Sequence, residues 1–274
     1  MFQFIKKMIY LLVDDDFNIN VLNDYISSLK KDLIFTRING QIDYISLINN
    51  SPNDTFIFIN QFFKVPITTQ TNVYILNVEQ LSIQSNTDNI MNNIPANIKL
   101  IDYSFSNIEY LKQLNRSYYY LPYQVNDSEI FDYPKIHDVV TIGWESQKRL
   151  NIRTQLLEKN IQVNHINGLF DGERDELLFK HKILVNVHFK EEYKVFEEMR
   201  CNRCIFNRMI VITEKSIYNE NNRLKKHMIE CEYSEIPDMV EKVLGSYDYY
   251  YNKLFAGFDL QEIKKYYAAF NDFL

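Results

Sequence analysis

Residues 182–216 read KILVNVHFKEEYKVFEEMRCNRCIFNRMIVITEKS, and this stretch decides the fold. Its apolar run at 182–188 predicts a buried strand, residues 195–207 predict a helix, and 209–213 predict a second buried strand. A strand, a helix and a strand in this order form a unit of a parallel sheet, in which polar residues gather where the strands end. We therefore predict an α/β fold with a ligand site at one edge of its sheet.

The same alternation extends through the chain and predicts two Rossmann-like domains, at residues 1–130 and 131–274. The polar segment 124–135 marks the boundary. The halves share an order of elements but no sequence repeat. In the first half we expect strands at 9–13, 33–38, 55–59, 73–77, 98–101 and 118–121, helices at 19–30 and 106–114, and loops at 68–71 and 85–95. In the second half we expect strands at 139–143, 161–166, 182–188, 209–213 and 229–231, helices at 148–159, 173–179 and 195–207, and further helices at the end of the chain.

Composition restricts the partners and the compartment. The chain has 274 residues, a net charge of −6 and no long basic run, which argues against nucleic acid as the main partner. The apolar start at 1–13 is interrupted by lysines and is too short to span a bilayer, so we expect no transmembrane segment and a cytoplasmic protein. Cys201 and Cys204 lack the further ligands of a zinc site, and we interpret them as buried thiols on a helix face.

Several polar residues are expected to converge at the strand ends of the second half. Glu197 and Arg200 are three residues apart and face the same side of a helix. Asn186 and His188 end one strand and point the same way, and Glu214 ends the next strand. The alternative for the Glu197–Arg200 pair alone is an ordinary surface ion pair. Gly143, Gly168 and Gly172 follow predicted strands, where glycine permits close approach of a ligand or simply marks a turn.

Taken with their order and spacing, these motifs resemble those of GT-B-fold glycosyltransferases, especially bacterial and large-DNA-virus members. The resemblance rests on V-N-V-H, F-E-E-M-R and V-I-T-E-K-S in the opening stretch, and it covers most of residues 70–216. The other segments that carry it are VTIGWESQKR at 140–149, INGLFDGERD at 166–175, YILNVEQ at 74–80, IDYSFSN at 101–107 and YLPYQ at 120–124.

The resemblance implies two Rossmann-like domains facing a central cleft, with the last helices packing back across both. It implies a nucleotide-sugar donor bound by the second domain, a sugar or glycan acceptor bound by the first, and no metal or other cofactor. Arg200 is assigned to the donor diphosphate, assisted by Lys148 or Arg149. Glu197 is assigned to the ribose or the sugar, and Glu214 to the sugar. Residues implied at the nucleotide-sugar site are Gly143, Lys148, Arg149, Asn186, His188, Glu197, Arg200 and Glu214.

An inverting transferase also needs a base near the acceptor hydroxyl, and Glu79 and Asp102 end two strands of the first half. Their alternatives are a helix cap for Glu79 and the start of a turn for Asp102. Asn202 and Arg203 stand where many relatives carry Phe-Glu. That departure keeps a different class open, namely a non-catalytic scaffold of the same fold that binds a sugar or a protein partner.

Two further motifs have competing interpretations. The triplet at 14–16 fits a metal-binding D-x-D motif or a response-regulator receiver, but Asn60 stands where a receiver needs aspartate, and we favour a helix cap. The aromatic segments 247–251 and 266–273 fit either a partner or membrane interface or the completion of a core. We favour the core.

Overall fold

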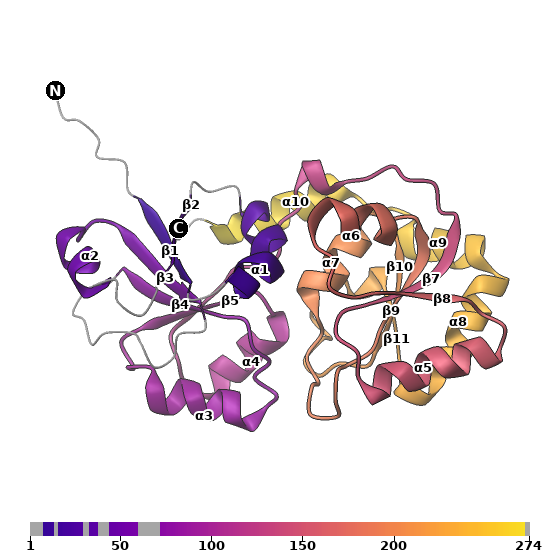
Figure 1. Cartoon of the computed structure of the whole chain (residues 1–274), viewed down its shortest axis with the longest axis horizontal. Coiled ribbons are helices and arrows are strands. Elements are labelled where there is room, and N and C mark those ends of the chain that lie inside the picture. Colours follow the sequence, from indigo (N-terminus) through magenta and orange to yellow (C-terminus); the bar gives the residue numbers. More distant parts are fainter. Residues whose placement is uncertain (1–7, 14–15, 30–32, 38–43, 60–71, 272–274) are drawn as a thin grey trace. The chain divides into compact units, whose positions relative to one another are not determined.

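The chain folds into two units of parallel α/β structure (Figure 1). The computed structural model describes residues 8–13, 16–29, 33–37, 44–59 and 72–271. The first unit comprises Met1–Pro122 with Ala268–Leu274, and the second comprises Tyr123–Tyr267. The chain therefore divides between Pro122 and Tyr123, earlier than residue 130, and its last residues return to the first unit.

The first unit contains one parallel sheet with the strand order β2-β1-β3-β4-β5-β6. Its strands are β1 (Ile9–Val13), β2 (Leu33–Arg37), β3 (Thr55–Ile59), β4 (Val73–Asn77), β5 (Lys99–Asp102) and β6 (Tyr118–Tyr120). Its helices are α1 (Asp16–Ser28), α2 (Tyr44–Asn50), α3 (Gln84–Asn93), α4 (Phe105–Gln113) and the short 3-10 helix Ala269–Asn271.

The second unit repeats this arrangement with the order β11-β10-β9-β7-β8, again with parallel strands. Its strands are β7 (His137–Ile142), β8 (Val163–Ile166), β9 (His181–Asn186), β10 (Ile210–Glu214) and β11 (Ile229–Cys231). Its helices are α5 (Gln147–Glu158), α6 (Asp171–Leu178), α7 (Glu198–Phe206), α8 (Ile236–Gly245), α9 (Tyr247–Phe255) and α10 (Leu260–Ala268), with 3-10 turns at Asp127–Glu129, Lys225–His227 and Tyr233–Glu235. In Figure 1, α5 and α8 lie on one side of this sheet, and α6 and α7 lie on the other.

When each sheet is numbered within its own unit, both have the order second, first, third, fourth, fifth, and the first unit adds a sixth strand beside the fifth. In this doubly wound topology the connections reverse direction between the first and third strands. The reversal lies between β1 and β3 in the first unit and between β7 and β9 in the second. The predicted α/β class is confirmed, and the two halves share an order of elements, as expected.

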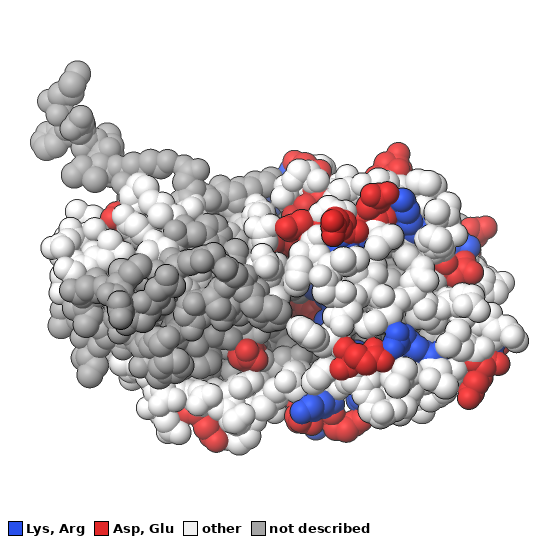
Figure 2. Space-filling model, viewed as in Figure 1, with Lys and Arg blue, Asp and Glu red and all other residues white. Residues whose placement is uncertain are grey.

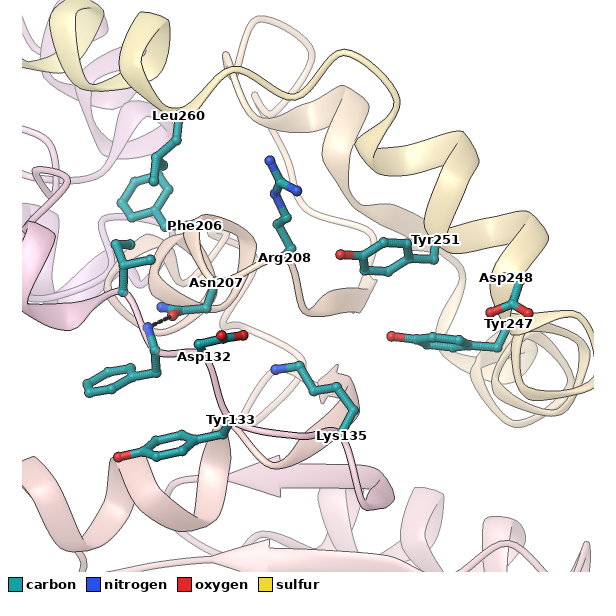
Figure 3. A pocket seen from close by; sticks show the side chains of 12 residues that line it. Asp132, Tyr133, Lys135, Phe206, Asn207, Arg208, Tyr247, Asp248, Tyr251 and Leu260 are labelled. Atoms are coloured by element: carbon teal, nitrogen blue, oxygen red, sulfur yellow. Dashed lines mark hydrogen bonds between the residues drawn. The ribbon is translucent and has the colours of Figure 1, made fainter.

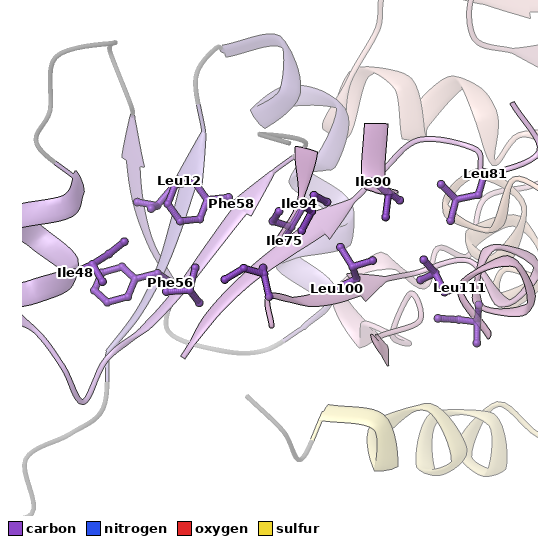
Figure 4. Close-up of a cluster of buried hydrophobic side chains, with 13 residues drawn as sticks. Leu12, Ile48, Phe56, Phe58, Ile75, Leu81, Ile90, Ile94, Leu100 and Leu111 are labelled. Atoms are coloured by element: carbon purple, nitrogen blue, oxygen red, sulfur yellow. The ribbon is translucent and has the colours of Figure 1, made fainter. Parts of the chain in front are cut away.

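The core of the first unit lies along the central strands. Every residue of β3 and β4 is buried, as expected for strands covered on both faces. Phe56, Phe58 and Ile75 contribute to a cluster of buried side chains (Figure 4), in which Ile90 of α3 and Leu111 of α4 also take part. The sheet and its helices therefore share one apolar interior.

The expected loop at 85–95 is wrong, because Gln84–Asn93 forms helix α3. Its sequence is poor in strong helix formers, and its N-terminal cap at Ile83 makes no side-chain hydrogen bond. The helix is stabilised instead by tertiary contacts. Ile90 is fully buried, and the Thr87 hydroxyl donates to the Leu81 carbonyl at 3.0 Å. Packing thus outweighs weak local propensity.

The remaining sequence expectations about the fold do not all hold. Cys201 and Cys204 are buried free thiols in α7, as predicted, and burial raises the pKa of Cys204 to about 12. The expected core role of the aromatic segment 247–251 is wrong, since Tyr249 is 63% exposed and Tyr247, Tyr250 and Tyr251 are only half-buried. Tyr267 is fully buried, as expected. The expected loop at 68–71 lies outside the described residues, as do Asp14 and Asp15.

Two surface properties bear on the expected partners. On the face shown in Figure 2, acidic and basic side chains of the second unit are interspersed instead of forming a large field of one sign. The absence of a nucleic-acid partner stays a prediction. Within the described residues, no helix combines the length and apolar character needed to cross a bilayer.

Candidate functional site

The candidate site lies at the carboxyl edge of the second unit's sheet, where the connections reverse. Gly143 follows β7, Asn186 ends β9, and Glu214 ends the adjacent β10. Ligands of doubly wound folds bind at this position, because the loops from neighbouring strands diverge there and leave a crevice. All eight residues assigned to the nucleotide-sugar site belong to this edge or to the starts of α5 and α7.

Gly143 permits two arginines to lie against the backbone. Its φ is +104°, a conformation that residues with a side chain rarely adopt. A Cβ atom there would lie 2.7 Å from Nη2 of Arg200 and 3.3 Å from Nη1 of Arg149. The glycine is therefore required both by the turn and by the space that the guanidinium groups occupy.

Arg149 is a buried cation fixed in place by several acceptors. It is 5% exposed, its Nε donates to the Val187 carbonyl at 2.9 Å, and its Nη1 donates to the Trp144 carbonyl at 2.7 Å. Its Nη2 lies 3.3 Å from Oε1 of Glu197. Burial and, next, the charge of Arg200 lower the pKa of Arg149 to about 10. The side chain therefore remains charged near neutral pH.

Arg200 is the more accessible of the two arginines. Its Nη1 donates to Oδ1 of Asn186 at 3.0 Å and pairs with Glu197. The side chain of Arg200 keeps 22% of its surface exposed. Glu197 does not lie inside the helix as expected, because α7 begins at Glu198 and Glu197 occupies the N-cap position. Its carboxylate there contacts both guanidinium groups.

Lys148 joins the network from the first turn of α5, whose N-terminus is capped by the hydroxyl of Ser146. Its Nζ lies 2.6 Å from Oε1 of Glu214 and 3.1 Å from Oε1 of Glu191. Burial lowers the pKa of Lys148, but hydrogen bonds to these two carboxylates outweigh it, and the net shift is upward. Three cations therefore line this edge of the sheet.

His188 and Glu214 connect the loops that follow β9 and β10. The backbone N–H of His188 donates to Oε2 of Glu214 at 3.1 Å. Nε2 of His188 lies 3.3 Å from both the Lys215 carbonyl and the Ser216 hydroxyl. Burial lowers the pKa of His188, which favours a neutral ring near pH 7. Its buried Nδ1 has no hydrogen-bond partner among the described residues.

Sequence reasoning missed three members of this network. Thr213 receives a hydrogen bond at 3.0 Å from Nδ2 of Asn186, and Glu191 pairs with Lys148. The Tyr233 hydroxyl donates to the Lys148 carbonyl at 2.9 Å. Thr213 could have been found because it directly precedes Glu214 in its strand. Tyr233 gave no sequence signal, since its segment shows no pattern linking it to α5.

Asn202 and Arg203, which depart from the related motif, are both interior residues. Arg203 is 4% exposed and pairs with Asp175 at 2.8 Å and with Glu129 at 2.9 Å. Asn202 is fully buried, and neither polar atom of its side chain has a partner among the described residues. Arg203 therefore has a structural role in an ion cluster.

The two candidate bases in the first unit differ in accessibility. Asp102 is fully buried and accepts hydrogen bonds from Nδ2 of Asn77 at 2.7 Å, from the Ser104 N–H at 2.8 Å and from Nδ2 of Asn107 at 3.0 Å. The assignment of Asp102 as a base therefore needs correction, since an acceptor cannot reach it. Glu79 is half-buried, and its backbone carbonyl accepts from the same two asparagines. Asp102 thus positions the loop that carries Glu79.

Asp102 is expected to make the stability of the chain depend on pH. Burial raises the pKa of this carboxyl from 3.8 to about 7, despite the three donors. Between pH 4 and 7 the folded chain retains a proton that the unfolded chain releases, so stability falls as pH rises. The contribution is about 1.4 kcal/mol per pH unit in this window.

Urea unfolding of the wild type and of Asp102→Asn across pH 4–8 measures this contribution. The wild type should lose stability relative to the variant as pH rises to 7, and the difference should level off above pH 7. Parallel pH profiles for the two proteins would show that the carboxyl keeps an ordinary pKa when folded.

Comparison with solved structures identifies the class of fold. The structure of sucrose-phosphate synthase from Thermosynechococcus elongatus superposes on this chain with a TM-score of 0.59 and 8% sequence identity. The match covers 98% of this chain and 95% of the synthase chain. TarM from S. aureus, solved in complex with Fondaparinux, α-GlcNAc-glycerol and UDP, superposes with a TM-score of 0.53 and 14% sequence identity. The match covers 83% of this chain and 57% of the TarM chain. The chain has the GT-B fold of glycosyltransferases.

Sequence comparison identifies the family within that class, although no protein-family model matches the chain. The chain belongs to the family of Uncharacterized protein R358 of Acanthamoeba polyphaga mimivirus, with 30% identity over 208 residues that make up 73% of this chain and 72% of R358. Uncharacterized protein L140 of the same virus is 29% identical over 88% of this chain. Uncharacterized protein L137 is 35% identical over 71% of this chain, which spans only 29% of that longer protein.

Proposed function

We propose that the chain is a glycosyltransferase that moves a sugar from a nucleotide-activated donor to a sugar or glycan acceptor. The observation that supports this most directly is that Arg149 and Arg200 lie beside Gly143, and Lys148 beside Glu214, at the carboxyl edge of the sheet where the strand order reverses. A diphosphate carries the charge that such a cluster would neutralise. The cations therefore lie where this fold is expected to bind a ligand, and their positive charge suits a diphosphate leaving group.

The cations are proposed to stabilise the nucleoside diphosphate as the sugar leaves. Arg149 is held by two backbone carbonyls and Arg200 by Asn186, so both are ordered before a ligand arrives. Donors fixed in advance lose little free energy to reorganisation when negative charge develops. We propose that Arg200, the more accessible arginine, contacts the diphosphate first, and that Lys148 assists. With three cations available, transfer needs no metal ion or other cofactor.

The carboxylates beside these cations are proposed to bind donor hydroxyls. Glu197 contacts both arginines, and Glu214 contacts Lys148 and the His188 backbone. A phosphate would replace part of each ion pair and leave carboxylate oxygens to accept hydrogen bonds from ribose or sugar hydroxyls. We assign Glu197 to the ribose or the sugar, and Glu214 to the sugar. Glu79 remains the candidate base, and we propose the cytoplasm, of the host in a viral setting, as the compartment.

The first test is a thermal-shift panel of nucleoside diphosphates and nucleotide sugars, each with a divalent cation and with EDTA. Stabilisation by one nucleotide that is unchanged by EDTA would support the proposed donor site, since a ligand at 100 times its Kd adds about 2.7 kcal/mol to stability. Release of nucleoside diphosphate in the presence of acceptors would then test transfer. Binding without release would identify the non-catalytic scaffold, and strict dependence on a metal would contradict metal-free transfer.

Gly143→Ala is expected to weaken binding of the nucleotide selected by that panel by about tenfold. The new Cβ would displace the guanidinium of Arg200, and the positive φ would cost roughly 1–2 kcal/mol of stability. Titration calorimetry measures the affinity. Gly172→Ala is the matched control, because this glycine lies in α6 and a Cβ there meets no atom within 4 Å. Equal affinities for both variants would remove Gly143 from the proposed site.

A further inference from the structure

A pocket lies at the edge of the same sheet opposite the proposed donor site. Its volume is about 560 Å³, within the range of small-molecule sites. Tyr133 and Lys135 precede β7, while Asn207 and Arg208 precede β10, so the pocket adjoins the amino ends of these strands. Gly143 follows the carboxyl end of β7, and Glu214 is the last residue of β10. Five or six residues at about 3.3 Å each place roughly 16–20 Å between the two sites.

Aromatic rings form two walls of this pocket (Figure 3). On one side the fully buried Phe179 stacks on Phe131 with ring centroids 5.0 Å apart, and Phe131 stacks on Tyr133 at 5.4 Å. On the other side α9 presents Tyr247 and Tyr251, one helical turn apart, with centroids separated by 5.8 Å. Figure 3 shows the hydroxyl groups of both α9 tyrosines pointing toward the pocket. The rings of Phe131 and Tyr133 are therefore anchored through the buried Phe179, while the hydroxyl ends of the two α9 tyrosines face the pocket.

Polar groups between these walls have few partners in the protein. Among the described residues, no hydrogen bond or ion pair involves the Asp132 carboxylate or the hydroxyls of Tyr247 and Tyr251. Nζ of Lys135 donates to the Phe179 carbonyl at 2.7 Å and pairs with no described carboxylate. Burial raises the pKa of Tyr247 to about 12, so its hydroxyl stays a neutral donor. The pocket thus offers donors and acceptors next to flat apolar surfaces.

The charged groups in the pocket lining balance in number. Lys135 and Arg208 contribute two positive charges, and Asp132 and Asp248 contribute two negative ones. The lining therefore has no excess charge of either sign that would favour an ion over a neutral ligand. A neutral sugar suits this balance, because its hydroxyls both donate and accept while its C–H face packs on an aromatic ring.

We propose that this pocket binds a short neutral oligosaccharide. The α9 tyrosines and Tyr133 would hold the C–H faces of the sugar rings, while Asp132 and Lys135 would accept from and donate to hydroxyls. The pocket is separate from the proposed donor site, and binding does not depend on whether the chain transfers sugar. The half-buried Tyr247 and Tyr251, which do not complete the core as expected, are explained by this site.

The test is titration calorimetry with maltotriose, cellotriose and chitotriose, supported by an array of neutral glycans. We expect a saccharide to bind, and Tyr251→Ala and Asp132→Asn to weaken that binding by at least about tenfold. Tyr251→Phe separates loss of the hydroxyl from loss of packing. Tyr249→Ala is the matched control, because Tyr249 lies on the same helix, is 63% exposed and does not line the pocket.

A variant of the proposed donor site tests whether the two sites are independent. Saccharide binding should survive Arg200→Ala and should not compete with a nucleoside diphosphate, even if transfer is never observed. Three outcomes would overturn the proposal: no glycan binds the folded protein, Tyr249→Ala weakens binding as much as Tyr251→Ala, or Arg200→Ala abolishes the binding.

Discussion

Replacing Arg200 by alanine is expected to weaken nucleoside-diphosphate binding by about 100-fold, equivalent to about 2.7 kcal/mol, while the protein stays folded. Arg200 is the partly exposed member of the cation cluster, and its partners Asn186 and Glu197 hold it beside Gly143. The alanine removes a charged hydrogen-bond donor. It also leaves the negative charge of Glu197 balanced by Arg149 alone, so an incoming phosphate meets more repulsion. Titration calorimetry with the nucleotide selected by the thermal-shift panel measures the change.

Two further variants make the Arg200→Ala result specific. Arg200→Lys keeps the charge but loses the planar fork of donors, and should recover only part of the affinity. Arg223→Ala removes an equal charge from an exposed pair with Glu262, and should leave affinity unchanged. Unaltered nucleotide affinity in a folded Arg200→Ala protein would reject the assignment of the donor site to this edge of the sheet.

The sequence was sufficient to predict the fold class because continuous apolar runs alternate with helices. All residues of β3 and β4 are buried. Strands that are buried on both faces can be recognised in the sequence as continuous apolar runs. The site was predictable for a related reason. Asn186 and Glu214 end adjacent parallel strands, so their convergence follows from topology once the strands are recognised.

Features decided by tertiary packing escaped prediction. Helix α3 is stabilised by the burial of Ile90, whereas its local sequence favours a loop. Asp102 ends a strand, like the residues of the second unit's site, but its own surroundings enclose it. Sequence position can place a carboxylate at a strand end. It does not reveal whether neighbouring asparagines will cover that carboxylate.

Tertiary packing also explains why Asn202 and Arg203 differ from the motif of the relatives. Many relatives carry Phe-Glu at this position, and the missing glutamate keeps a non-catalytic scaffold open as an alternative. In the structure Arg203 binds Asp175 and Glu129 in the interior of the second unit. A buried ion pair needs both partners, so a substitution in this cluster should affect folding before it affects any ligand.

Asp175→Ala is therefore expected to lower the free energy of unfolding by about 3–5 kcal/mol. Asp175 is 5% exposed and accepts from Nη1 and Nη2 of Arg203 at 3.0 and 2.8 Å, and from Nε of Arg174 at 2.8 Å. Its removal leaves two buried guanidinium groups without this shared carboxylate. Urea denaturation, with the transition of the second unit followed separately, measures the loss.

Asp138→Ala is the matched control, because its carboxylate pairs with Lys182 at the surface and should contribute less than about 1 kcal/mol. A second variant tests the cause. If the cost arises from uncompensated buried charge, adding Arg203→Met to Asp175→Ala should restore part of the stability, since an apolar side chain needs no counter-charge. Equal losses for Asp175→Ala and Asp138→Ala would mean that water reaches the cluster, and its contribution to the fold would then be that of a surface pair.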